Sequence, residues 1–234
     1  ILNLAFIGHL NDPAMLAGVG MGNMTQTLCG LSIVYGFNSA LDTLISQAAG
    51  SNNIRLCGLY LNKGRFIMTV LFVPIVSILV NTEALLVSLG QNEEVAKYAQ
   101  QYVMVYMPGL YISGLADCQR RFLNNFGLNI FSFLSGFIGM CLHTVWLYVF
   151  LVRNGMGIAG IGYANVCSQI IVYAMLLIFT YRQEHLREAW IWPDATVVKA
   201  LGSYFALALP STFCLVLDWW VWELMVLISG YLGV

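Results

Sequence analysis

The last long apolar segment of the sequence, residues 207–230, contains two carboxylates, Asp218 and Glu223. A carboxylate at the mid-depth of a bilayer costs about 2.5 to 3.5 kcal/mol, so it needs a compensating partner or a role. Asp218 lies near the centre of this segment, and its side chain is too short to reach water along the helix. It either accepts hydrogen bonds from a neighbouring helix or faces a polar cavity as a protonation switch or cation ligand.

Glu223 follows Asp218 by five residues, which on an α-helix is a rotation of about 140° beyond one full turn. The two carboxylates therefore do not share one stripe of the helix. Asp218 is the stronger candidate for binding a cation or a substrate, and for Glu223 a functional role and an ion pair or headgroup contact are equally open. Pro210, in the same segment, suits a helix that bends in a transporter, although such kinks also occur in static bundles.

Other polar residues in or beside the apolar segments are candidates for a gate or a polar cavity. The residues assigned to that role are Asp42, Gln47, His143 and Pro210. Asp42 is expected to cap a helix or to pair across an inner gate with a loop arginine such as Arg55. For His143, a neutral ring hydrogen-bonded to a neighbour is favoured over a proton relay.

Asp117 stands about one turn from the inner end of its helix. Arg120 and Arg121 follow it at i+3 and i+4, the two spacings at which helical side chains meet. The sequence therefore predicts a local ion pair for Asp117.

The composition identifies the solvent of these segments. Of 234 residues, 59% are hydrophobic and 9% are charged, and the mean hydropathy is +0.78, whereas soluble domains carry about 25% charge. This is the composition of an integral membrane protein, with connections too short to hold a soluble domain.

The six cysteines match no zinc spacing. No metal, nucleic-acid partner or enzymatic activity is expected.

Apolar stretches of spanning length, about 20 residues, recur along the whole chain. The expected spans are residues 18–46, 58–80, 98–123, 130–152, 158–181 and 201–232. Residues 1–8 are interpreted as the tail of a truncated first helix. The predicted fold class is all-α, a polytopic bundle of about six full spans.

The basic residues predict how the spans are oriented. If the first helix exits outward, eight of the ten lysines and arginines lie at inner loops or inner helix ends, a strong bias under the positive-inside rule. The eight are Arg55, Lys63, Arg65, Arg120, Arg121, Arg182, Arg187 and Lys199. This orientation disfavours a seven-helix receptor.

Three stretches together resemble the multidrug and toxic compound extrusion (MATE) family, most closely its eukaryotic members. They read FIGHLNDPAMLAGVGMGN, GFNSALDTLISQAAGSNN and LPSTFCLVLDWWVWELMVLISGYLG, and cover residues 6–23, 36–53 and 209–233. The resemblance implies half of a twelve-helix transporter with two lobes. Residues 1–197 would be most of the N-terminal lobe, and residues 198–234 the first helix of the C-terminal lobe.

The resemblance also implies an antiporter that exports organic cations or other amphipathic compounds in exchange for H⁺ or Na⁺, with no other cofactor. Family members carry a coupling carboxylate, usually Glu, where Asp218 stands. Asn3 occupies the position of an ionisable aspartate found in many prokaryotic relatives, which shifts coupling to Asp218. The implied protein is monomeric once completed by its second lobe, in the plasma membrane or in a vacuolar or other endomembrane.

Two alternatives remain at this point. A related lipid-linked oligosaccharide flippase would more often carry basic residues inside its cavity, and no Lys or Arg lies in the middle of these spans. A non-transporting receptor or structural membrane subunit would give no account of Asp218.

Overall fold

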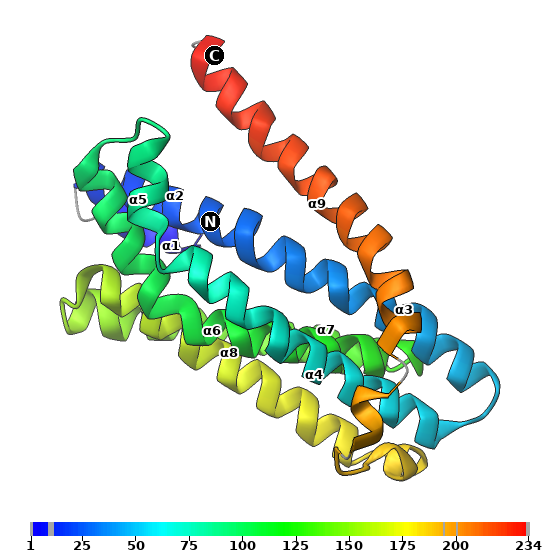
Figure 1. The fold of residues 1–234 in the computed structure, drawn as a ribbon. Helices are drawn as coiled ribbons and strands as arrows, with labels where there is room; N and C mark the ends of the chain where they lie inside the picture. The colour runs from blue at the N-terminus through cyan, green and yellow to red at the C-terminus, as the bar shows by residue number, and fades with distance from the viewer. Residues whose placement is uncertain (1, 9–11, 194, 200, 233–234) are drawn as a thin grey trace.

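The computed structural model describes residues 2–8, 12–193, 195–199 and 201–232. The side chains of residues 4, 195, 223, 224 and 226–232 lie outside that description. The described residues are mostly helical and include no strand (Figure 1), which confirms the all-α fold class.

The described chain forms nine α-helices, most of them joined by short connections and the last two by a longer loop. In order they are α1 (Leu2–Gly8), α2 (Pro13–Gln26), α3 (Ser32–Gly50), α4 (Ile54–Leu79), α5 (Thr82–Ser88), α6 (Glu93–Asn125), α7 (Asn129–Leu147), α8 (Gly157–Tyr181) and α9 (Leu201–Leu232). Two π-helical stretches, Thr27–Leu31 and Tyr148–Arg153, join α2 to α3 and extend α7. Two 3₁₀ turns, Glu184–Ala189 and Ala195–Val198, lie between α8 and α9.

The helices start earlier than the apolar runs because polar caps precede those runs. Asp12 accepts a hydrogen bond from the Met15 backbone N–H (3.0 Å) and is followed by a proline at the first helical position. Asn53 caps α4 in the same way through Leu56 (3.0 Å). All six predicted spans are helices, but those expected from residues 18, 58 and 98 begin at residues 13, 54 and 93.

Five of the helical stretches are long and apolar enough to cross a membrane. They are Pro13–Gly50, Ile54–Leu79, Asn129–Arg153, Gly157–Tyr181 and Leu201–Trp222. The sixth predicted span, α6, has 33 residues, which is ample length, but it carries Glu93 and Glu94 in its first turn and Asp117, Arg120 and Arg121 within its last ten residues. It lies inside the bundle, where α2, α3, α4 and α8 pack against it.

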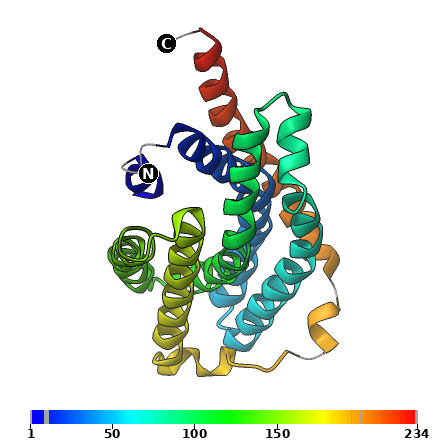
Figure 2. The same cartoon turned by 90° about the vertical axis from the view of Figure 1, so that its left-hand side faces the viewer.

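The helix α9 is attached to the bundle mainly through α3. Tyr204, buried in the core, donates a hydrogen bond from its hydroxyl to the Phe37 backbone carbonyl (3.0 Å). Farther along, Gly36 lets α9 come so close that an added Cβ would lie 2.6 Å from the Thr212 Cα. Toward its C-terminal end, α9 projects away from the other helices (Figures 1 and 2).

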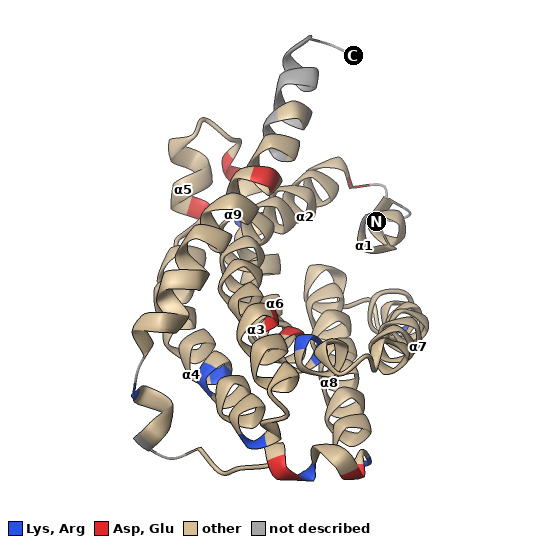
Figure 3. Cartoon of the chain, turned by 90° about the vertical axis from the view of Figure 1, so that its right-hand side faces the viewer, with Lys and Arg blue, Asp and Glu red and all other residues tan. Residues whose placement is uncertain are grey.

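The charged residues are distributed unevenly along the bundle. Most lysines and arginines lie in the lower half of the view in Figure 3, on α4, near the end of α6 and on the loop after α8. The orientation of this basic end toward the inner side of a membrane stays a prediction.

Candidate functional site

The strongest polar feature inside the bundle is an arginine shared by two carboxylates. Arg121 of α6 forms an ion pair with Asp42 of α3 and another with Asp117 one turn earlier on α6 (Nε to Oδ2, 2.8 Å). Its remaining guanidinium nitrogen donates to the Tyr35 backbone carbonyl (3.4 Å). Arg121 therefore joins α3 to α6 through both side chains and backbone.

Neighbouring amides and a second arginine complete this group. Asn38 donates to Asp117 (3.1 Å), Asn125 donates to Asp42 (3.3 Å), and Arg120 lies 3.6 Å from Asp117. We call Asn38, Asp42, Asp117, Arg120, Arg121 and Asn125 the α3–α6 cluster. Its two carboxylates and two guanidinium groups balance, so the cluster is neutral overall. Such a cluster holds two helices together, because each charge has its partners in place.

The cluster confirms one prediction and corrects another. The local ion pair of Asp117 with the two following arginines is present. The expected pairing of Asp42 with Arg55 was wrong, because Arg55 stands in the exposed first turn of α4, while Arg121 reaches Asp42 from the packed face of α6. Only tertiary packing brings Asp42 and Arg121 together, so spacing along the chain gave no signal for this pair.

A second polar group surrounds His143 of α7. Its Nε2 lies 2.8 Å from the Asn3 amide oxygen, and its Nδ1 lies 3.0 Å from the Ser168 hydroxyl of α8. The Asn3 amide nitrogen in turn donates to the Tyr102 hydroxyl (3.3 Å). The expectation that His143 is hydrogen-bonded to neighbours is confirmed. Asn3, singled out because it cannot ionise, is one of those neighbours.

The other gate and cavity candidates lie apart from these groups. Gln47 is exposed near the end of α3 and makes no side-chain hydrogen bond within the described residues. Pro210 is exposed on α9, which continues through it as one helix. Pro210 lines an open groove of about 560 Å³ between α3 and α9, together with Ser39, Ser211, Cys214 and Leu215.

Asp218 differs from every carboxylate of the α3–α6 cluster. It is exposed and has no hydrogen bond or ion pair within the described part of the chain. Ser211 and Cys214 precede it by seven and four residues, so the three share one stripe of α9. Ser211 and Cys214 line the groove between α3 and α9, and Asp218 follows about one turn beyond the lining residues, on the same face of α9. The side chain of Glu223 lies outside the described residues, so its role stays a prediction.

The residue after Asp218 connects α9 with the cluster. Trp219 packs edge-on against Tyr35 of α3, with ring centroids 5.9 Å apart and an interplanar angle of 87°. The Tyr35 hydroxyl lies 3.1 Å from the Ser113 hydroxyl of α6, and its backbone carbonyl accepts from Arg121. One tyrosine therefore contacts both the helix with the unpartnered carboxylate and the arginine that joins α3 to α6.

The fold and these groups define a multi-pass α-helical membrane protein in which α9 carries an exposed carboxylate, Asp218, without a partner among the residues that the structure describes. The chain belongs to the MatE family, whose model matches residues 1–149.

Related proteins agree with this assignment. The chain is 31% identical over its full length to multidrug and toxin extrusion protein 2 of Pongo abelii, and 32% identical over 99% of its length to multidrug and toxin extrusion protein 1 of Danio rerio. It spans only 40% and 39% of the lengths of these two relatives.

Solved structures show the same fold. The crystal structure of the eukaryotic MATE transporter AtDTX14 matches with a TM-score of 0.91 at 23% identity, over 98% of this chain and 51% of that one. An inward-facing MATE family transporter of the MOP superfamily matches with a TM-score of 0.77 at 19% identity, over 92% of this chain and 50% of that one.

Proposed function

We propose that the complete protein is a secondary active antiporter that exports organic cations or other amphipathic compounds in exchange for H⁺ or Na⁺. Membership of the MatE family and the relatives named multidrug and toxin extrusion proteins support an export function. The single observation that carries the coupling role is the Asp218 carboxylate, which is exposed on α9 about one turn beyond the groove residues Ser211 and Cys214 and has no partner in the described residues.

An unpartnered carboxylate in a membrane helix suits ion coupling for a physical reason. With neither an arginine nor an amide beside it, its negative charge is left to be balanced by a proton, a metal cation or a cationic substrate. These ligands exclude one another, since one charge balances one charge. Binding of the coupling ion would then displace the organic cation, which is the exchange that an antiporter needs.

The neighbouring residues suggest how occupancy of Asp218 is passed on. Trp219 rests on Tyr35, and the next residue of α3, Gly36, lies so close to α9 that an added Cβ would be 2.6 Å from the Thr212 Cα. A rotation or bend of α9 near Pro210 would move this contact while the α3–α6 cluster keeps α3 and α6 together. Protonation of Asp218 removes its charge and so lowers the cost of moving this part of α9 through the membrane.

The test is ion-driven efflux of an organic cation by the complete protein in proteoliposomes. Asp218→Asn should abolish coupled efflux, and Asp218→Glu should retain it because the carboxylate is kept. The matched control is Glu94→Gln, which removes the same charge from the exposed first turn of α6. Efflux at the normal rate and with normal ion dependence in the Asp218→Asn protein would exclude the proposal.

A further inference from the structure

A second site lies at the basic end of the bundle, where the loop after α8 folds back over α4. The 3₁₀ turn Glu184–Ala189 crosses α4 so closely that a Cβ on Gly58 would lie 2.1 Å from the Ala189 carbonyl oxygen. One turn farther along α4, Asn62 donates a hydrogen bond to the Ile191 carbonyl (2.9 Å). These two contacts fix the loop over the first turns of α4 and create a groove beneath it.

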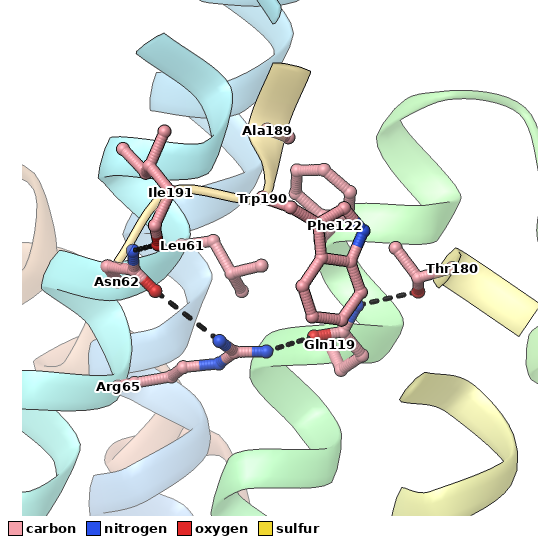
Figure 4. A pocket seen from close by; sticks show the side chains of 9 residues that line it. All are labelled: Leu61, Asn62, Arg65, Gln119, Phe122, Thr180, Ala189, Trp190 and Ile191. Atoms are coloured by element: carbon pink, nitrogen blue, oxygen red, sulfur yellow. Dashed lines mark hydrogen bonds between the residues drawn. The ribbon is translucent and has the colours of Figure 1, made fainter. Parts of the chain in front are cut away.

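The floor of this groove is formed by the guanidinium of Arg65. One of its terminal nitrogens donates to the Asn62 amide oxygen (3.3 Å) and the other to the Gln119 amide oxygen (2.5 Å). Gln119 is held in turn by a hydrogen bond to Thr180 at the end of α8 (2.6 Å). Figure 4 shows the Arg65 side chain running beneath Leu61 toward Gln119.

The partners of Arg65 leave its charge uncompensated. Both acceptors are neutral amides, and its Nε atom is buried with no hydrogen-bond partner. No carboxylate of the described residues lies within ion-pair distance of Arg65, or of the other two basic residues on α4, Arg55 and Lys63. A partly buried guanidinium without an anion is costly. It is stabilised by any anion that can reach it.

The space beside Arg65 is open and partly aromatic. A groove of about 390 Å³ is lined by Asn62, Arg65, Trp190, Ile191, Trp192 and Pro193. A second groove, of about 530 Å³, lies across the same loop segment and includes Arg55. Trp192, which lines both, is 92% exposed. An exposed tryptophan beside arginines is typical of the level at which lipid headgroups meet the hydrocarbon of a bilayer.

We propose that the groove of about 390 Å³ beside Arg65 and Trp192 binds the phosphate group of an anionic phospholipid, with Arg65 as its principal ligand. A guanidinium fork matches the geometry of phosphate oxygens, and basic pockets between membrane helices bind anionic lipid headgroups. Trp192 packs along the glycerol and upper acyl region, and Arg55 lies at the rim. A soluble phosphate would share the contact with Arg65 but would gain nothing from Trp192, which favours the lipid.

The test measures lipid retained by the complete, purified protein after exposure to vesicles of phosphatidylcholine containing phosphatidic acid, read by native mass spectrometry. The unaltered protein should retain phosphatidic acid in preference to phosphatidylcholine. Arg65→Gln should lower that retention on the order of tenfold, the worth of one charged hydrogen-bonded contact. The matched control is Arg187→Gln, which removes an exposed charge from the same loop and should leave retention unchanged.

Several outcomes would overturn the proposal. Equal retention of the two lipids, unchanged retention in Arg65→Gln, or the same loss in Arg187→Gln would show no specific site. Inorganic phosphate that displaces the lipid at equal concentration would assign the groove to a soluble anion.

A second variant keeps the test valid if Arg65→Gln does not fold. Trp192→Ala removes an exposed side chain that the core does not need, so the protein should fold normally. It should retain several-fold less phosphatidic acid. Full retention in this variant would exclude a lipid bound along Trp192.

Discussion

The α3–α6 cluster and Asp218 place the same chemical group in opposite circumstances. Asp117 is 8% exposed and meets Arg120, Arg121 and Asn38, so its charge is balanced within the bundle. Asp218 is exposed on α9 and meets no partner among the described residues. A carboxylate whose partners are all in place stabilises the fold, whereas one without partners is available to a ligand or to a lobe outside this chain. The comparison separates charges that are balanced inside the bundle from a charge that is not, by their contacts rather than by their positions in the sequence.

The largest effect on stability is expected when Arg121, the arginine shared by Asp42 and Asp117, is removed. Arg121→Gln should destabilise the complete protein by about 3 kcal/mol, since the buried Asp117 would keep its charge with only Asn38 and the more distant Arg120 (3.6 Å) as partners. The measurement is the thermal unfolding midpoint of the purified protein. Arg187→Gln is the control, because its ion pair with Glu184 joins two side chains that are 74% and 85% exposed and is worth little. Equal unfolding midpoints for the two variants would show that the cluster is not structural.

The next largest loss of stability is expected for a substitution at Gly36, where α9 packs against α3. Gly36→Ala should cost about 2 kcal/mol, because the new Cβ would lie 2.6 Å from the Thr212 Cα and one helix must move. It should also impair efflux, because the contact between Trp219 and Tyr35 lies beside this point. Gly20→Ala on α2 is the control, since nothing lies within 4 Å of its added Cβ. An unchanged unfolding midpoint for Gly36→Ala would show that the close approach of the two helices is dispensable.

A smaller effect is expected at the exposed end of the cluster. Asp42 is 49% exposed, so Asp42→Asn should cost about 1 kcal/mol, because solvent screens its ion pair with Arg121. Asp117→Asn, at a buried position of the same cluster, should cost clearly more. Chemical or thermal unfolding of the two variants side by side measures the difference. The reverse order would mean that burial does not set the value of these charges.

The helices and their order could be predicted from the sequence because apolar runs of membrane length are a local signal. The caps at Asp12, Asn53 and Asn92 were local too, and counting them would have moved the predicted starts of α2, α4 and α6 to their observed positions. The ion pair of Asp117 follows from helical spacing alone. These features depend on residues within one or two turns of each other.

The remaining contacts could not be predicted because they join distant segments. The partner of Asp42 lies 79 positions away on α6, and the partners of His143 lie on α1 and α8. The groove at Arg65 depends on a loop more than a hundred residues later in the chain. Which arginine reaches which carboxylate follows from packing between helices, so spacing along the sequence carries no signal for it.

The smallest effect on stability is expected at Asp218, and it tests the contrast with the α3–α6 cluster most directly. Asp218→Asn should change the free energy of unfolding of the complete protein by less than about 0.5 kcal/mol, because no described contact is lost. The same substitution should abolish ion-coupled efflux. Unfolding and transport are measured on one preparation, with Arg121→Gln as the converse case, in which stability falls first. A large loss of stability in Asp218→Asn would show that its partners, contributed from beyond this chain, use the charge to hold the two lobes together. Asp218 would then be structural, like Asp117, and coupling would have to be carried by another group.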